Sequence, residues 1–367
     1  MILAYDGWMD SSRVSRRRFL TAIGAAAPLA VTAQAPPPTG SLTDVAGVRV
    51  GHFTDTRRPT GCTAILFDRP VTAGADYDGS APGESLGLML QPVSPLEQIH
   101  GILLSGGGPM ALGATAGVVR FLEERNVGYD WGVPNVRVPI VVGAVIDDLA
   151  LGDGRIRAGA DEAYRACQSA STSAVAEGSV GAGTGATVGK LFVGRGMPGM
   201  KGGLGCASAR LGDIVIGALV VVNASGDIVD RRTGAIVAGA RTADARGFAR
   251  TVDVLRRDLE SRRADRALRD DPLRATTLAV VATNVALTKT QLTKVAMMAN
   301  SGAARAINPY HTQSDGDQVI ALSTGALNAG VSLTSLGAMA AEVVADAIVR
   351  AVRVASGLPG WSAVRDL

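Results

Sequence analysis

Short apolar segments alternate with alanine-rich segments along most of this chain, and that alternation limits the folds open to it. Runs such as Ile214–Asn223 and Leu278–Thr283 have the length of buried strands, whereas Leu336–Val354 has the length of a helix covered on most sides. Glycine is abundant, with 46 residues, and only 4% of residues are aromatic, which favours closely packed layers over a core of large rings. Periodicity alone therefore predicts a layered α/β or α+β fold.

The other elements follow from the same two periodicities and from turn residues. A capping-box pattern at Thr288–Gln291 opens a helix that we expect to end at Ser301-Gly302. A second helix is predicted at Ala111–Arg125, after a glycine-rich turn. Further strands are predicted at Val45–Val50, Cys62–Phe67, Ile102–Leu104, Val138–Val145 and Gln318–Thr324.

Composition and spacing exclude several classes of protein. The net charge of +3 is small and forms no basic stripe with interleaved aromatics, so we predict no nucleic-acid partner. Three cysteines and three histidines are too few and too scattered for a disulfide framework or a metal site. The segment Gly181–Lys190 resembles a phosphate-binding loop but lacks the required spacing, which leaves a flexible glycine-rich segment. No metal or cofactor is predicted.

The first 35 residues have the pattern of a twin-arginine signal peptide. Arg16 and Arg17 precede an apolar run, Ala22–Thr32, and Ala33–Ala35 has the form of a signal-peptidase site. The run is too short for a permanent membrane anchor, so we predict an exported protein, periplasmic or extracellular, with a proline-rich linker at 36–40. Met1 and Met9 both remain possible starts, and a chance arginine cluster before a short helix is the alternative.

Two threonines open the apolar strand that follows a charged, proline-containing segment. A cut before Thr276 would place a new α-amine beside its own hydroxyl, and an amine with a pKa near about 8 can act as the general base for that hydroxyl. Thr276 is therefore a candidate N-terminal nucleophile, with Ala275–Thr276 as the cleavage site. The alternative is that both threonines only open a strand, where threonine is common.

Seven motifs follow one another between about Ser41 and the C-terminus: Thr43–His52, Leu103–Gly107, Lys201–Gly205, Val222–Ala224, the Thr276-Thr277 junction, Asp315–Asp317 and Ala321–Thr324. In these motifs the chain resembles the P1 (S58-type) family of N-terminal nucleophile peptidases. That family includes L-aminopeptidase/D-esterases, β-peptidyl aminopeptidases and endo-type hydrolases of nylon (6-aminohexanoate) oligomers. The resemblance implies a four-layer α/β/β/α sandwich in one domain, 41–367, cut into fragments 41–275 and 276–367, and a homo-oligomer, with a tetramer suspected.

The same resemblance implies roles for several polar residues. Asn223 and a lysine would stabilise the oxyanion, with Lys190 favoured over Lys201, and Asp315 and Asp317 would orient the amine of the nucleophile. Plain turn and strand-end chemistry is the alternative for these residues.

Three further positions bear on the substrate and on the junction. Asp147, where the family usually has an aromatic, and the backbone turn at Gly106 and Gly107 are candidates for substrate binding. Ala275 replaces the family's usual Asn or Gly, and we therefore expect slower processing rather than none.

These features predict an amidohydrolase or aminopeptidase that acts through an acyl-enzyme. Its substrates would be small peptides, amino-acid amides or ω-amino-acid oligomers, and the Thr nucleophile with Asp-Gly-Asp looks more like the nylon-oligomer branch. Two alternatives stay open: an unprocessed, inactive relative that acts as an oligomeric binding protein, and an acyltransferase similar to the ornithine acetyltransferases.

Overall fold

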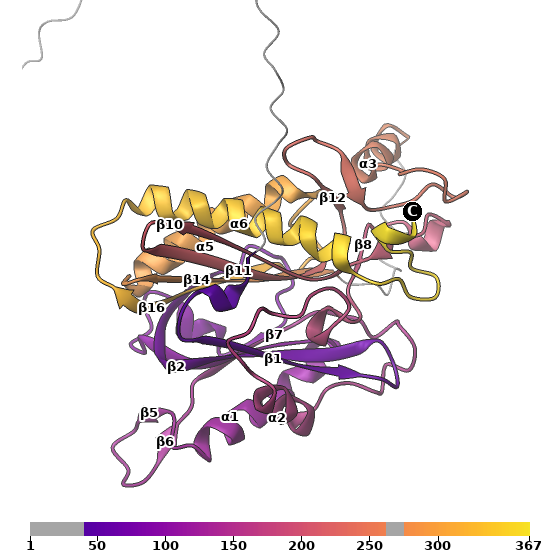
Figure 1. Cartoon of the computed structure of the whole chain (residues 1–367). Coiled ribbons are helices and arrows are strands. Elements are labelled where there is room, and N and C mark those ends of the chain that lie inside the picture. The colour runs from indigo at the N-terminus through magenta and orange to yellow at the C-terminus, as the bar shows by residue number, and fades with distance from the viewer. Residues whose placement is uncertain (1–39, 262–274) are drawn as a thin grey trace, which may run out of the picture. The chain divides into compact units, whose positions relative to one another are not determined.

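Two helices, α5 (Lys289–Ala306) and α6 (Leu333–Val354), cover one face of a β layer in the computed structural model, which describes residues 40–261 and 275–367 (Figure 1). A second β layer lies beneath the first, and α1 (Thr115–Glu123) and α2 (Ala160–Gln168) cover its far side. The predicted four-layer α/β/β/α sandwich is therefore confirmed. The predicted signal peptide and residues 262–274, just before the junction, lie outside the described residues.

One long strand, β2 (Thr60–Asp76), joins the two β layers. Its first half pairs with β1 and β4, whereas its last residues, 72–76, pair with β16, and the register shifts between these halves. The strands in spatial order are β10 (Gly203–Leu211), β11 (Ile214–Asn223), β14 (Thr276–Val285), β16 (Gln318–Leu327), β2, β4 (Gln98–Ser105), β7 (Val141–Val145) and β3 (Glu84–Ser85), with β1 (Val48–Asp55) beside β2.

Shorter elements lie around this framework. They comprise the helix α3 (Thr251–Glu260), the three-stranded sheet β13 (Ile236–Ala238), β12 (Asp227–Val229) and β15 (Ile307–Asn308), the pair β5 (Tyr129–Asp130) and β6 (Arg137–Val138), and the pair β8 (Thr187–Val188) and β9 (Met200–Lys201).

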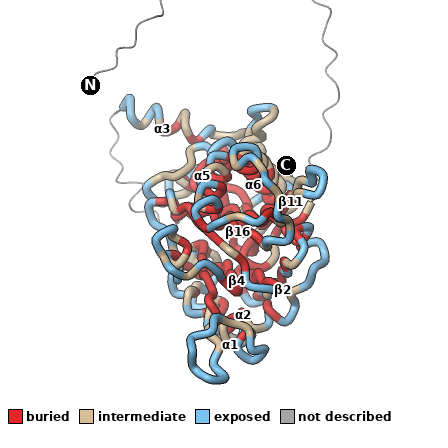
Figure 2. Tube along the Cα trace, turned by 90° about the vertical axis from the view of Figure 1, so that its left-hand side faces the viewer, coloured by how far each residue is buried: buried red, intermediate tan, exposed pale blue. Residues whose placement is uncertain are grey.

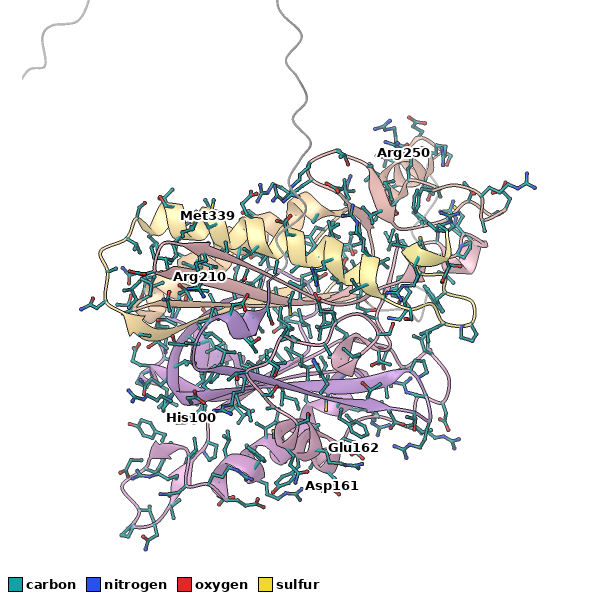
Figure 3. All side chains as sticks on the ribbon, viewed as in Figure 1. His100, Asp161, Glu162, Arg210, Arg250 and Met339 are labelled. Carbon is teal, nitrogen blue, oxygen red and sulfur yellow. The ribbon has the colours of Figure 1, made fainter. Side chains whose placement is uncertain are left out.

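Apolar side chains fill three spaces between the layers. Val281 packs with Leu292 of α5 and Val344 of α6, while its neighbour Val280 faces the space between the two β layers. Because both faces of β14 are buried, its sequence is continuously apolar rather than alternating. The third space, around Val118, lies under α1 and α2. Figure 2 shows buried residues through the middle of the molecule and exposed ones around it, and Figure 3 shows side chains filling the spaces between layers.

The helix predicted to end at Ser301-Gly302 continues to Ala306, so that prediction is wrong. A Cβ on Gly302 would lie 2.1 Å from the carbonyl oxygen of Ala341 in α6. Glycine is therefore needed here for close contact between two helices, and it does not end the helix.

The bounds of β11 equal the prediction, whereas those of other predicted elements differ. The helix predicted from Ala111 begins as a 3₁₀ segment, Gly108–Ala114, before α1, and the strand predicted from Val138 begins only at Val141. Within the described parts of the chain, no helix is both long and apolar enough to cross a membrane.

Candidate active site

The first residue of β14, Thr276, lies in the middle of the first β layer, between β11 and β16. Its side chain is buried, and its hydroxyl donates a hydrogen bond to the carbonyl oxygen of Ala275 at 2.5 Å. The hydroxyl is thus turned towards the peptide group that a cut before Thr276 would break.

The main chain of Ala275 is held from one side by the segment 314–316. Its N–H donates to the carbonyl of Ser314 at 3.4 Å, and its own carbonyl accepts from the N–H of Gly316 at 3.0 Å. A Cβ on Gly316 would lie 2.9 Å from the Thr276 hydroxyl oxygen and 2.3 Å from the carbonyl of Ala81. Only glycine fits this position, and its N–H lies where negative charge would develop if Thr276 attacked.

Asn223 is the Cα partner of Thr276 across the β11–β14 ladder, and facing residues in such a pair have neighbouring side chains. The Asn223 Oδ1 accepts from Lys190 Nζ at 2.6 Å and from the Thr187 N–H at 3.0 Å. Its Nδ2 donates to the carbonyl of Asp147 at 3.2 Å. The amide is therefore held on both sides, with a buried ammonium on its oxygen, and the structure brings Lys190, Asn223 and Thr276 together.

Lys201 lies in a different environment, because its Nζ donates to the main-chain carbonyls of Gly183, Ala186 and Gly202 at 2.8–3.0 Å. Burial lowers the pKa of Lys201 to about 7, and the charge of Lys190 acts in the same direction. Three acceptors match the three protons of an ammonium, so the contacts favour the charged form. Lys201 clamps the glycine-rich segment that leads to Lys190, and this segment, expected to be flexible, is largely buried.

Asp315 and Asp317 flank Gly316 and are both buried. The Asp317 Oδ1 accepts from the N–H of Thr277 at 2.6 Å. Asp315 accepts from the N–H groups of Ser225 at 3.3 Å and Thr312 at 3.1 Å. Burial, together with the charge of Asp317, raises the pKa of Asp315 to about 6. Both carboxylates therefore lie beside the junction, with Asp317 bound one residue beyond Thr276.

Asp147, a candidate for substrate binding, is half-buried, and its carboxylate accepts from the N–H of Leu149 at 3.0 Å. Gly106 and Gly107, the other candidates for substrate binding, lie against Asp148, the residue that follows Asp147. The Gly107 N–H donates to Asp148 at 2.9 Å, and a Cβ on Gly106 would lie 2.1 Å from the same carboxylate. This close contact explains glycine at position 106, whereas Gly107 has a φ of +101°, which favours glycine.

Sequence reasoning missed the buried ion pair between Arg58 and Asp148. Arg58 also donates to the carbonyls of Asp148 at 2.8 Å and Leu151 at 2.9 Å, and the Thr60 hydroxyl donates to Asp148 at 2.8 Å. Because the carbonyl of Asp147 accepts from Asn223, this pair fixes the chain segment that holds the Asn223 amide. Burial raises the pKa of Asp148, although Arg58 opposes that shift. An arginine in a turn-rich segment and an acid at a strand end give no signal of such a pair.

Among the described residues, no group of three or more His, Cys, Asp or Glu side chains is placed to hold a metal ion. The structure instead brings together the hydroxyl of Thr276, the buried Lys190–Asn223 pair, the two buried carboxylates of Asp315 and Asp317, and the Gly316 N–H that donates to the carbonyl of Ala275. These are the parts needed for acyl transfer to a hydroxyl.

Comparisons with known proteins agree with this chemistry. The family described as Peptidase family S58 matches residues 40–365. An uncharacterised aminopeptidase of Mycobacterium bovis is 38% identical, over 89% of this chain and 97% of the relative. A 6-aminohexanoate-oligomer endohydrolase of Kocuria sp. is 32% identical, over 84% of this chain and 85% of the relative.

A solved structure extends the agreement to the fold. The L-aminopeptidase D-Ala-esterase/amidase of Ochrobactrum anthropi, described as a variant of the Ntn hydrolase fold, superposes with a TM-score of 0.62 at 22% identity, covering 88% of each chain.

Proposed function

Because this chain belongs to peptidase family S58 and is a hydrolase of peptide or amide bonds, we propose that Thr276 is its nucleophile, released by cleavage of its own chain. The observation that carries the proposal is the 2.5 Å contact between the Thr276 hydroxyl and the carbonyl oxygen of Ala275.

Self-cleavage would proceed by transfer of the Ala275 acyl group from nitrogen to oxygen. The Thr276 Oγ1 attacks the Ala275 carbonyl carbon, and the Gly316 N–H stabilises the oxygen that becomes negative. The C–N bond breaks as the ester forms, and the hydroxyl proton ends on the new amine. Water then hydrolyses the ester, which leaves a carboxylate on Ala275 and a free α-amine on Thr276.

Turnover of a substrate would repeat this chemistry in trans. The α-amine of Thr276 takes the hydroxyl proton, and the oxygen attacks a substrate carbonyl. Asn223, whose Oδ1 is held by Lys190, donates from Nδ2 to the tetrahedral oxygen. The leaving amine takes the proton as the C–N bond breaks, and water resolves the acyl-enzyme. Asp317 orients the amine through its contact with the next main-chain N–H, that of Thr277.

The substrates in this proposal are short peptides, amino-acid amides or linear amino-acid oligomers with a free amine. The aminopeptidase and oligomer-hydrolase relatives support this range. The proposal also includes export by the twin-arginine route, which the Arg16-Arg17 pattern supports. Assembly of the cleaved chains into a homo-oligomer is proposed from the family resemblance.

Intact mass and N-terminal sequencing of purified protein test the proposal. Wild type should give two chains, the smaller comprising residues 276–367 and beginning Thr-Thr-Leu-Ala. Thr276→Ala should give one uncut, inactive chain, whereas Thr276→Ser, which keeps a hydroxyl, should still be cut. Uncut wild type that hydrolyses amides such as L-alanine 4-nitroanilide would show that Thr276 is not an N-terminal nucleophile.

A further inference from the structure

His311 has a backbone conformation that residues other than glycine seldom adopt. Its φ is +55°, in the left-handed region, which residues other than glycine adopt uncommonly and at a cost, although Asn, Asp and His do so more often than the rest. The ring is partly buried and stacks on Tyr310, with 3.9 Å between ring centroids. Strain of this kind persists only where surrounding contacts maintain it, so the contacts of His311 indicate what the strained conformation achieves.

Two nitrogen atoms of His311 approach the same carboxylate oxygen of Asp317. The main-chain N–H donates to Oδ2 at 3.3 Å, and the ring Nδ1 lies 3.2 Å from it. The contact between Nδ1 and Oδ2 has the distance of an ion pair but not the alignment of a hydrogen bond. It therefore stabilises the carboxylate through the charge of a protonated ring. The other oxygen, Oδ1, accepts from the N–H of Thr277. Asp317 therefore links the His311 ring to the residue after the nucleophile.

The surroundings of His311 are acidic. The charges that act on its ring are those of Asp317, just before β16, of Asp76, the last residue of β2, and of Asp78, just after β2. Asn300 of α5 binds Asp76 at 2.9 Å and accepts from the Tyr310 hydroxyl at 2.8 Å, which fixes the stacked ring. Burial lowers the pKa of His311, but the contact with Asp317 and the other acids outweigh it, and the net pKa is raised.

We propose that His311 is a positioning residue that holds the Asp317 carboxylate against the Thr277 N–H and, as an imidazolium, offsets its negative charge beside the Thr276 amine. This inference rests on the proposed role of Thr276. A carboxylate near the α-amine favours its ammonium form, which cannot accept a proton. The imidazolium reduces that effect, so the amine remains available as a base at lower pH.

The test uses variants that separate strain from charge. Asn and Gly both accept a left-handed conformation but carry no titrating ring. In His311→Asn and His311→Gly the acid limb of the pH profile of kcat/KM should move to higher pH. At a fixed pH on that limb, a displacement of the limb by about one pH unit lowers kcat/KM about tenfold. The readout is hydrolysis of L-alanine 4-nitroanilide by the cleaved protein, because the Thr276 α-amine exists only after cleavage.

Ring-proton NMR gives a second readout that needs no activity. The chain has only three histidines, and the His311→Asn spectrum identifies the His311 signal by its loss. In Asp317→Asn the pKa of His311 should fall towards its usual value. Unchanged pH profiles in both His311 variants, or an unchanged His311 titration in Asp317→Asn, would refute the inference. Failure of the underlying function is a separate result, since Thr276→Ala would then remain active or wild type would remain uncut.

Discussion

The buried acid Asp315 gives the sharpest prediction about stability. It is 2% exposed and lies beside Asp317, so its charged form is costly. Burial is the main cause that raises its pKa to about 6 from 3.8, with the charge of Asp317 second, against hydrogen bonds from Thr312 and Ser225. We predict that Asp315→Asn stabilises the fold above about pH 6.

The sign follows from proton binding. Because the pKa is higher in the folded state, that state binds more protons between about pH 4 and 6, and stability falls as pH rises through this range. A difference of about 2 between the folded and unfolded pKa values corresponds to a cost of about 3 kcal/mol above pH 6. The neutral amide removes this cost, but it offers one acceptor oxygen where the carboxylate has two.

The lost acceptor leaves Ser225 or Thr312 without a partner, at about 1–2 kcal/mol. The net effect is a gain of about 1–2 kcal/mol at pH 8. Below pH 4 the Asp315 carboxyl is itself neutral, so burial of a charge no longer costs anything. Only the lost hydrogen bond remains, and Asp315→Asn then lowers the free energy of unfolding by about 1–2 kcal/mol. The change in the free energy of unfolding should therefore reverse its sign between pH 4 and pH 8.

Urea unfolding at pH 4, 6 and 8 measures this, in a Thr276→Ala background so that all chains are uncut. Asp161→Asn is the matched control, because Asp161 is an exposed acid paired with Arg120, and a surface change of this kind shifts stability by less than about 0.5 kcal/mol. If Asp315→Asn destabilises equally at pH 4 and pH 8, the carboxylate carries no burial cost and the reasoning is wrong.

Two more predictions concern catalysis and export. Asp317→Asn should keep the fold and lower kcat about 10²-fold or more, because the Thr277 N–H loses its charged partner beside the nucleophile; an unchanged kcat with unchanged urea unfolding would reduce Asp317 to a turn former. Replacement of Arg16 and Arg17 by lysine should leave the protein in the cytoplasm, measured by cell fractionation, and unchanged periplasmic recovery would exclude twin-arginine export.

The elements that the sequence predicts well are those whose composition reports local burial. β11 and β14 are continuous apolar runs because helices cover one face and a second β layer covers the other. Gly302 shows the limit of such reasoning, since a glycine can mark the end of a helix or its contact with another helix. Only the position of α6 decides between these two roles.

The sequence names candidate site residues, but it does not predict how they are arranged. Lys190 and Lys201 lie in similar glycine-rich surroundings in the sequence, and only the folded chain shows that one binds Asn223 and the other three carbonyls. The pair Arg58–Asp148 joins segments far apart in the chain and carries no periodic signal. Contacts of this kind depend on which strands become neighbours, and local composition contains no information about that.

Ala275 shows why a departure from a family pattern can leave the chemistry possible. The sequence suggests that the junction lacks a polar side chain to hold it. In the structure the N–H and the carbonyl of Ala275 are both bound by the segment 314–316, through main-chain groups that any residue except proline can offer. The strict requirement lies instead at Gly316, where a Cβ would meet the Thr276 hydroxyl and the Ala81 carbonyl. The geometry of the junction is therefore set by the segment 314–316, which lies opposite the proposed cleavage site, rather than by the side chain of Ala275.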